Sequence, residues 1–408
     1  MIQTRSRTGS GMGEAIAGML LIAGTYGMAR FGVGLFAPVL AASRPDLVPV
    51  LGWAAAAQFM SYSAAAAVAA RLVDRRPRAG VVLAGITSTL GCLGVAAASD
   101  PLVFVLAVLV GGMGGGFASP ALVPLIDAAA NPESVQTAQS VVNAGTAAGV
   151  IGAGVIAFTV PAVGPAWVLM AFVCAASAGV LWYSVRGLTV GSGTVFVRNI
   201  PAASAEGADG RGGTPAPGSW RPLLLPGVAA AVVGAGSAAV WTFGPLLISG
   251  AGTVPADRVG WLWIALGLGG LLGTFTGKLV GRAGLRGGWL VCSAALALAT
   301  AAVSVCLAAG SAWPAYFGMA LFGAGYMGMS AVLILWARAV RPGGAGAGTS
   351  LLFVALATGQ AAGSAGGGAA WGLLDPVLLT AAAAVVCAAG GLSVVAGVRR
   401  LRVPEQTG

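Results

Sequence analysis

The sequence predicts an all-α integral membrane protein with twelve transmembrane helices in two pseudo-symmetric six-helix bundles. Three observations lead to this fold class. Hydrophobic residues make up 58% of the 408 residues and charged residues only 8%, with a mean hydropathy of +0.92, a composition that water-soluble domains of this length do not have. Twelve apolar stretches are long enough to cross a bilayer, and short motifs of the first half recur in the second.

The apolar stretches fix the expected helices, because a helix crosses the hydrocarbon core with about 20 residues. They cover residues 14–41, 50–70, 80–98, 102–126, 136–160, 165–185, 223–249, 258–280, 288–309, 312–336, 349–371 and 376–397. We number them spans 1 to 12. The first span follows Arg5 and Arg7, but its apolar stretch is too long for the core of a cleaved signal peptide.

The basic residues indicate the orientation, because Lys and Arg accumulate in cytoplasmic loops. With the N-terminus inside, eighteen of the 21 basic residues fall in inner segments, Arg44 and Arg258 fall in outer loops, and Arg30 lies within span 1. We therefore expect a multi-pass protein of the cytoplasmic (inner) membrane with both termini in the cytoplasm. This topology explains the net charge of +10, which does not indicate nucleic acid.

Internal repeats divide the chain into two halves. Phe36–Leu40 matches Phe243–Leu247 and Arg71–Arg75 matches Lys278–Arg282, both at an offset of 207 residues. Gly145, Gly149, Gly152 and Gly154 of span 5 are matched in span 11 by Gly359, Gly363, Gly366 and Gly368. We expect an N-terminal bundle (1–186), a Gly-, Pro- and Ser-rich cytoplasmic linker (187–221) and a C-terminal bundle (222–408).

The residue types present exclude several kinds of site. The chain has no histidine, which rules out His-based metal sites, Ser-His-Asp triads and histidine proton relays. Its five cysteines are scattered singly through the spans, without metal-ligand spacing or a disulfide framework.

The loop after span 2, ARLVDRRPR (residues 70–78), resembles the G-x-x-x-D-R-x-G-R signature of the major facilitator superfamily, and GKLVGRAGLR (residues 277–286) resembles its second copy. The Gly27-Met-Ala-Arg30-Phe31 pattern further resembles the branch called YbfB/YjiJ. The resemblance covers essentially the whole chain. It implies the superfamily fold, in which spans 1, 4, 7 and 10 surround a central cavity.

The signature loops are interpreted as a conformational latch made of Asp74, Arg75 and Arg78, with a weaker second copy at Lys278 and Arg282, where Gly281 replaces the acid. An acid in such a loop pairs with Arg and caps a helix of the opposite half only when the cytoplasmic side is closed. The alternative is that these residues are ordinary positive-inside charges.

The glycine series of span 5 places Gly145, Gly149 and Gly152 on one helical face, and Gly359 and Gly363 do so in span 11. Two interpretations are equally supported. Small residues at this spacing let helices pack closely, and the span-5 series, including Gly154, resembles the glycine-rich signature of superfamily antiporters, with Val150 in place of its proline.

Arg30 is the main candidate for a substrate contact, because a charge inside a span costs about 2.5–3.5 kcal/mol and normally faces a cavity with a partner. No acid lies within one turn of it in the sequence. A guanidinium offers a planar fork to carboxylate or phosphate, so we expect the substrate to supply the partner; freed backbone carbonyls near Gly27, Gly32 and Gly34 are the structural alternative. The remaining predicted substrate contacts are Tyr26, Met113, Phe117, Asn143, Ser237, Trp241, Phe322, Tyr326 and Gln360.

Energy coupling has few candidates. The span-4 arginine of many drug/proton antiporters would fall at Val110, so it is absent, and no acid lies in the middle of a span. Asp127 is the better proton-carrier candidate and Glu14 the weaker one, against the alternative that both are interfacial charges. A proton carried on the substrate, or exchange of two anions, stays open.

The sequence as a whole predicts a secondary active transporter that moves a small organic molecule by alternating access, in the direction of efflux. Import or exchange of a small organic anion is the alternative, and a membrane-embedded enzyme or a channel is a more distant one. We expect a small-molecule substrate, membrane lipid and protons as partners, a monomeric chain, and neither cofactor nor metal.

Overall fold

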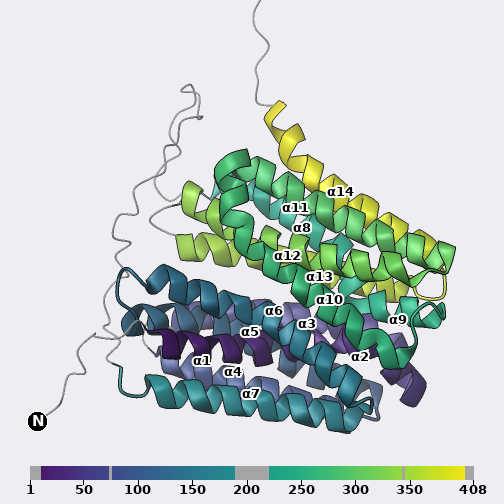
Figure 1. Cartoon of the computed structure of the whole chain (residues 1–408), viewed down its shortest axis with the longest axis horizontal. Coiled ribbons are helices and arrows are strands. Elements are labelled where there is room, and N and C mark those ends of the chain that lie inside the picture. Colours follow the sequence, from purple (N-terminus) through teal and green to yellow (C-terminus); the bar gives the residue numbers. More distant parts are fainter. Residues whose placement is uncertain (1–10, 73–75, 189–219, 342–344, 400–408) are drawn as a thin grey trace, which may run out of the picture.

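The computed structural model describes residues 11–72, 76–188, 220–341 and 345–399, and these residues form helices joined by short connections (Figure 1). The N-terminal elements are α1 (Met12–Ile22), η1 (Ala23–Met28), α2 (Gly32–Ser43), η2 (Pro45–Val50), α3 (Leu51–Leu72), α4 (Pro77–Ala97), α5 (Pro101–Ala129), α6 (Val135–Thr159) and α7 (Val163–Val185). The C-terminal elements are α8 (Arg221–Ala238), η3 (Ala239–Phe243), α9 (Gly244–Gly250), η4 (Ala256–Arg258), α10 (Val259–Leu271), η5 (Leu272–Phe275), α11 (Thr276–Ala309), α12 (Ala312–Val340), α13 (Ala345–Ala369) and α14 (Pro376–Arg399).

The helices form two bundles that lie one above the other in Figure 1, with α1–α7 in the lower bundle and α8–α14 in the upper one. The contacts between them run through α3 with α13, α6 with α10, and α2 with α9. We call the end where α1 and α8 begin the proximal end and the opposite end the distal end. The positive-inside rule predicts that the proximal end is cytoplasmic.

The number of spans depends on how two segments are counted. In the described residues nine helical runs are long and apolar enough to cross a membrane, or ten when the bent pair Met12–Met28 and Gly32–Ser43 counts as one. α3 is helical over 22 residues but less apolar, since it carries Gln58 and two serines. Ala256–Ala309 counts as a single run of 54 residues, which Gly284 breaks with φ 71°. These two segments account for the difference from the predicted twelve.

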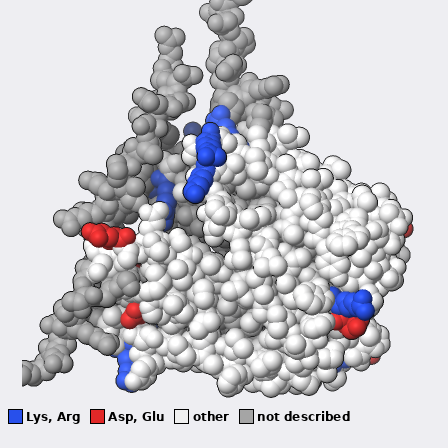
Figure 2. All heavy atoms as spheres, viewed as in Figure 1, with Lys and Arg blue, Asp and Glu red and all other residues white. Residues whose placement is uncertain are grey.

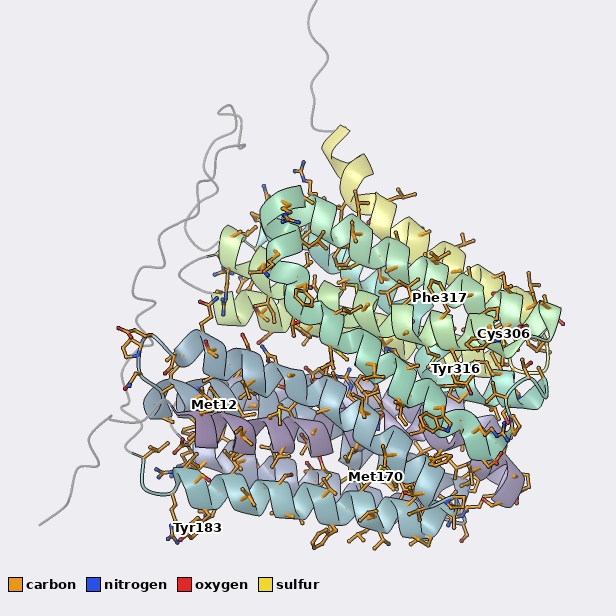
Figure 3. The ribbon with its side chains drawn as sticks, in the orientation of Figure 1. Met12, Met170, Tyr183, Cys306, Tyr316 and Phe317 are labelled. Carbon is orange, nitrogen blue, oxygen red and sulfur yellow. The ribbon has the colours of Figure 1, made fainter. Side chains whose placement is uncertain are left out.

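The outer surface is that of a protein surrounded by lipid. Charged side chains gather at the two ends of the molecule, with an uncharged surface between them on the face that Figure 2 shows. Large apolar side chains point outward along the helices, such as Phe317, which is 60% exposed, and Tyr183, which is 65% exposed (Figure 3). Such exposure is favourable only in an apolar solvent.

The two bundles are packed against each other at the distal end. A Cβ atom built on Gly34 of α2 would lie 1.8 Å from the carbonyl oxygen of Trp241. Gly154 of α6 and Gly260 of α10 face each other so closely that a Cβ on Gly154 would lie 2.6 Å from the Gly260 oxygen. Only glycine permits such backbone approach, so the distal end is closed.

Towards the proximal end α6 and α10 separate. Gly270 still lies near Ala147, whose Cβ is 3.6 Å from the position of a Gly270 Cβ. One turn further on, Asn143 is exposed, and Gly277 in α11 has no neighbouring atom within 4 Å of its Cβ position. The structure is therefore closed distally and looser proximally.

Arginine side chains also fasten helix ends within the N-terminal bundle. Arg44, just after α2, donates hydrogen bonds from Nη1 to the carbonyls of Val95 and Ala98 at 3.0 and 2.6 Å, and from Nη2 to Ala96 at 2.8 Å. These are the unpaired carbonyls at the C-terminal end of α4, where a cation is favourable. Arg44 therefore ties the distal ends of α2 and α4 together.

Candidate binding site around Arg30

Arg30 lies at a break in the first span. The π-helix η1 ends at Met28, residues 29–31 form a turn, and α2 starts at Gly32 with a bend of 42°. Pro38 lacks the N–H that would bond the carbonyl of Gly34, and a π-helical turn is a common feature of functional sites. The break frees the Ala29 carbonyl, which accepts a hydrogen bond from Gln58 Nε2 at 3.3 Å.

Four aromatic rings surround the Arg30 guanidinium. Its Cζ atom lies 3.9 Å from the centre of the Tyr62 ring, 4.5 Å from Tyr26, 5.1 Å from Phe59 and 5.2 Å from Phe31. Desolvated cation–π contacts contribute about 2 kcal/mol each, so the rings offset much of the cost of burying a side chain that is only 2% exposed.

The edges of the guanidinium are only partly satisfied. Arg30 Nη2 donates a hydrogen bond to Gln360 Oε1 at 3.4 Å, and Gln360 Nε2 in turn donates to Tyr326 Oη at 3.1 Å. Arg30 Nε and Nη1 are buried without any hydrogen-bond partner. No carboxylate pairs with Arg30 in the described residues, so the site has an uncompensated positive charge and two donor atoms without acceptors.

The C-terminal bundle supplies the opposite wall. The Trp241 ring stacks on Phe31 with centroids 3.9 Å apart, and Phe322 and Tyr326 meet Trp241 edge to face at 5.3 and 5.1 Å. Trp241 is 2% exposed, and its Nε1 atom has no hydrogen-bond partner. The Phe31–Trp241 stack therefore joins the two halves beside Arg30.

The structure brings together six of the predicted contacts: Arg30, Tyr26, Trp241, Phe322, Tyr326 and Gln360. Ser237 is buried, but its hydroxyl donates to the Gly234 carbonyl of its own helix at 2.8 Å. Asn143 is exposed on α6, Met113 is only partly buried, and Phe117 is buried with no ring contact to this cluster among the described residues. The role of all of these in binding stays a prediction.

Span 2 contributes residues of the Arg30 cluster that are not among the predicted substrate contacts. Gln58, Phe59 and Tyr62 of α3, together with Phe31 of span 1, all touch Arg30 or its backbone neighbour. Phe59 and Tyr62 are three residues apart in an alanine-rich helix, so they share one face. That spacing, in a span rich in alanine, was the available signal.

The predicted latch is only partly visible. Asp74 and Arg75 lie outside the described residues. Arg78 donates from Nε to the Val185 carbonyl at 3.0 Å and from Nη2 to the Leu188 carbonyl, both at the C-terminal end of α7 in its own bundle. Lys278 and Arg282 are exposed at the proximal end. In this state Arg78 therefore acts as a helix cap, and the latch stays a prediction for the opposite state.

The two proton-carrier candidates lie near the proximal end, as their sequence positions indicated. Asp127 is half-buried near the end of α5, and Glu14 is half-buried in the first turn of α1. Neither touches the Arg30 cluster in any interaction of the described residues. Their part in coupling therefore stays a prediction.

The glycine series of α6 faces the first span. Cβ atoms on Gly145 and Gly149 would lie 2.4 and 2.2 Å from the carbonyl oxygens of Met19 and Ala23, and one on Gly152 would lie 2.5 Å from Met28 Cε. In the other half, Cβ atoms on Gly359 and Gly363 would lie 1.9 and 2.1 Å from carbonyl oxygens of α8. The two series thus hold spans 1 and 7, which carry Arg30 and Trp241.

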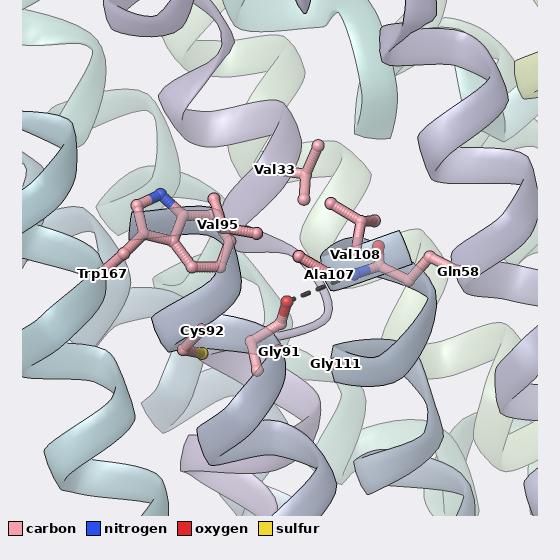
Figure 4. A pocket seen from close by; sticks show the side chains of 10 residues that line it. Val33, Gln58, Gly91, Cys92, Val95, Ala107, Val108, Gly111 and Trp167 are labelled. Carbon is pink, nitrogen blue, oxygen red and sulfur yellow. Dashed lines mark hydrogen bonds between the residues drawn. The ribbon is translucent and has the colours of Figure 1, made fainter. Parts of the chain in front are cut away.

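The space among Ala29, Val33, Gln58 and Trp167 is too small to hold a water molecule (Figure 4). Sites for drug-sized ligands are typically about 300–1,000 Å³. This part of the N-terminal bundle is therefore ordinary packing and not a ligand site.

Comparison with known proteins identifies the family. The family model described as Major Facilitator Superfamily matches residues 19–367. No curated protein matches the chain.

Solved structures of transporters share the fold. A POT family transporter in complex with a thioalcohol-conjugated peptide has a TM-score of 0.73 at 11% identity, with 96% of this chain and 97% of that chain covered. The nucleoside transporter NupG has a TM-score of 0.69 at 11% identity, with 97% and 100% covered. A bacterial homologue of the human lysosomal transporter Spinster, inward-facing and unoccupied, has a TM-score of 0.63 at 16% identity, with 95% and 94% covered.

The family match extends over most of the chain, and the helical bundles, the internal repeat and the similar structures agree with it. The chain is thus a membrane-embedded transporter of small molecules rather than an enzyme. It belongs to the Major Facilitator Superfamily.

Proposed function

We propose that this transporter exports a small organic molecule from the cytoplasm and binds an anionic or strongly polar group of that molecule at Arg30. The observation that carries the proposal is a buried guanidinium with two unpartnered donor atoms and no carboxylate partner in the described residues. Leaving a buried charge incompletely paired is costly. A substrate that supplies the missing acceptor recovers that cost.

Alternating access explains how a buried site is reached. Every ring around the guanidinium belongs to the N-terminal bundle, whereas Trp241 and Gln360 belong to the C-terminal one. Beside Arg30, separation of the halves breaks the long hydrogen bond to Gln360, the Phe31–Trp241 stack and the edge-to-face contact of Phe31 with Tyr326. The same movement that opens the protein to one side therefore exposes the guanidinium edges to a substrate.

Export is supported by the likeness of the α6 glycine series to the span-5 signature of superfamily antiporters. Import or exchange of an organic anion is the second candidate, and the unpaired charge of Arg30 favours it as much as it favours export. For export we propose proton coupling, with Asp127 as the first acid to replace. The chain is proposed to act as a monomer in the cytoplasmic membrane with both termini inside.

A growth-inhibition panel tests the proposal. Anionic, neutral and cationic toxic compounds are applied to an efflux-deficient bacterium that expresses the native chain, Arg30→Ala or Arg186→Ala. We expect protection against anionic or polar compounds that is lost in Arg30→Ala and kept in Arg186→Ala, because Arg186 is exposed just after α7, outside the Arg30 cluster and both signature loops.

Three outcomes of the panel decide between the alternatives. Protection that disappears when the proton gradient is collapsed supports proton-coupled export. Arg30-dependent sensitisation to the compounds shows import instead. Protection that survives Arg30→Ala overturns the assignment of the binding site.

A further inference from the structure

The central site contains unused hydrogen-bond donors and an unbalanced single charge. In the described residues the buried side-chain nitrogens without a partner include Arg30 Nε and Nη1 and Trp241 Nε1. Phe31 connects them, since its ring lies 5.2 Å from Arg30 Cζ and 3.9 Å from the Trp241 ring. Each of these atoms can only donate, so the missing ligand must present acceptors.

From this arrangement we propose that the substrate is a flat aromatic monocarboxylate with a second acceptor oxygen, held by Arg30 at the carboxylate and by Trp241 Nε1 at that oxygen. The proposal rests on the proposed function and names the substrate class of the same site. Three features of the cluster carry it, and they concern charge, geometry and wall chemistry.

The charge of the site fits one negative charge. Among the charged side chains of the described residues, Arg30 alone is buried. A dianion would bring a second charge without a partner, and a zwitterion would bring an ammonium group with no carboxylate to receive it. Either would pay a desolvation penalty of several kcal/mol for the extra ion.

The geometry at Arg30 fits a carboxylate. The rings of Tyr62 and Tyr26 lie 3.9 and 4.5 Å from Arg30 Cζ at 82° to each other, so a ligand cannot approach the guanidinium from the two sides that these rings occupy. The unpartnered donors Nε and Nη1 lie in the guanidinium plane and point outward from its edges. Nε and Nη1 each share an edge with Nη2, so a planar carboxylate can occupy either edge once Nη2 releases its 3.4 Å hydrogen bond to Gln360.

The walls fit an aromatic body. Phe31, Trp241, Phe322 and Tyr326 form a continuous series of ring contacts beside Arg30, with centroid separations of 3.9, 5.3 and 5.1 Å from Trp241. Rings favour stacked and edge-to-face neighbours. Buried tryptophan nitrogens normally find an acceptor, so the free Nε1 atom marks where the second oxygen of the ligand belongs.

A binding experiment with paired ligands tests the inference. Purified protein in lipid nanodiscs is titrated with the 2-, 3- and 4-methoxybenzoates and with the ethylbenzoates of the same shape, which lack the ether oxygen. We expect at least one methoxy isomer to bind roughly five- to tenfold more tightly than its ethyl counterpart, as one hydrogen bond allows. Trp241→Phe should abolish that preference.

Trp167→Phe is the matched control, because Trp167 is also buried with an unpartnered Nε1 but lies in the N-terminal bundle against Phe36. Trp167→Phe should keep the preference for the methoxybenzoate over the ethylbenzoate. Thermal melting of each variant confirms that it is folded. Phthalate, phenylalanine and benzamide test the charge count, and each should bind at least tenfold more weakly than benzoate.

Three results would overturn the inference while leaving the proposed function intact. The first is Arg30-dependent protection against dianions or zwitterions in the growth panel, with no benzoate binding. The second is a methoxy preference that survives Trp241→Phe. The third is the absence of a methoxy preference at every ring position. Failure of the proposed function would give a different result: benzoate would then bind equally well to the native protein and to Arg30→Ala.

Discussion

At the residue scale, two arginines of the same bundle show opposite uses of one side chain. Arg44 is half-buried and donates three hydrogen bonds to carbonyls at the end of α4. Arg30 is buried and makes a single long hydrogen bond to Gln360. The first arginine is fully used by the fold, whereas the second retains donor atoms that the fold does not need.

This contrast predicts opposite effects of one substitution. Arg30→Met should abolish transport and leave the melting temperature unchanged or higher, because replacing an incompletely paired buried ion by an apolar side chain is often neutral or stabilising by about 1–4 kcal/mol. Arg44→Met should lower the melting temperature, because it leaves the α4 carbonyls without donors. Differential scanning fluorimetry with a transport assay measures both; a marked loss of stability in Arg30→Met would mean that Arg30 is structural.

At the element scale, glycines determine which helices of opposite halves touch. Gly154 in α6 and Gly260 in α10 have backbone contact that no larger residue permits. Gly154→Ala should therefore destabilise the distally closed state by about 1–3 kcal/mol, as overpacking does. It should shift the population toward a distally open state.

Spin labels on the exposed distal positions 46 and 257 report that shift as a longer interlabel distance. Gly179→Ala is the control, since Gly179 of α7 has no atom within 4 Å of its Cβ position. The control should leave the distance distribution unchanged. An unaltered distribution in Gly154→Ala would show that the α6–α10 contact does not hold the distal end closed.

At the scale of the whole molecule, the two bundles are expected to move against each other as units. Phe158 of α6 and Trp261 of α10 meet at the distal end with ring centroids 5.2 Å apart. Cysteines at these two positions, joined by a short reducible linker, should stop transport, and reduction should restore it. The five native cysteines are buried, so they are replaced by alanine only to remove background reaction.

The matched control is either cysteine alone with the same reagent, which should transport normally. Continued transport by the linked protein would mean that the distal contact does not open during the cycle.

The sequence alone led to the fold class and to the residue at the centre of the candidate site, for reasons visible in single residues. Long apolar stretches indicate membrane-spanning helices, and an isolated charge such as Arg30 is easily recognised within such a stretch. Ser237 and Trp241 were both predicted contacts; Ser237 donates its hydroxyl proton to its own helix, whereas Trp241 stacks on Phe31 beside Arg30. Phe59 and Tyr62 were missed because rings in an apolar span have no distinguishing hydropathy.

The burial of Arg30 also has an electrical consequence. Without a bound anion the site holds one buried positive charge, and with a monoanion bound it is neutral. A membrane potential does about 2.3 kcal/mol of work per 100 mV on a charge carried fully across, and it acts on whatever fraction of that path Arg30 travels. The membrane potential should therefore affect the conformational change of the empty protein and have little effect on that of the substrate-bound protein.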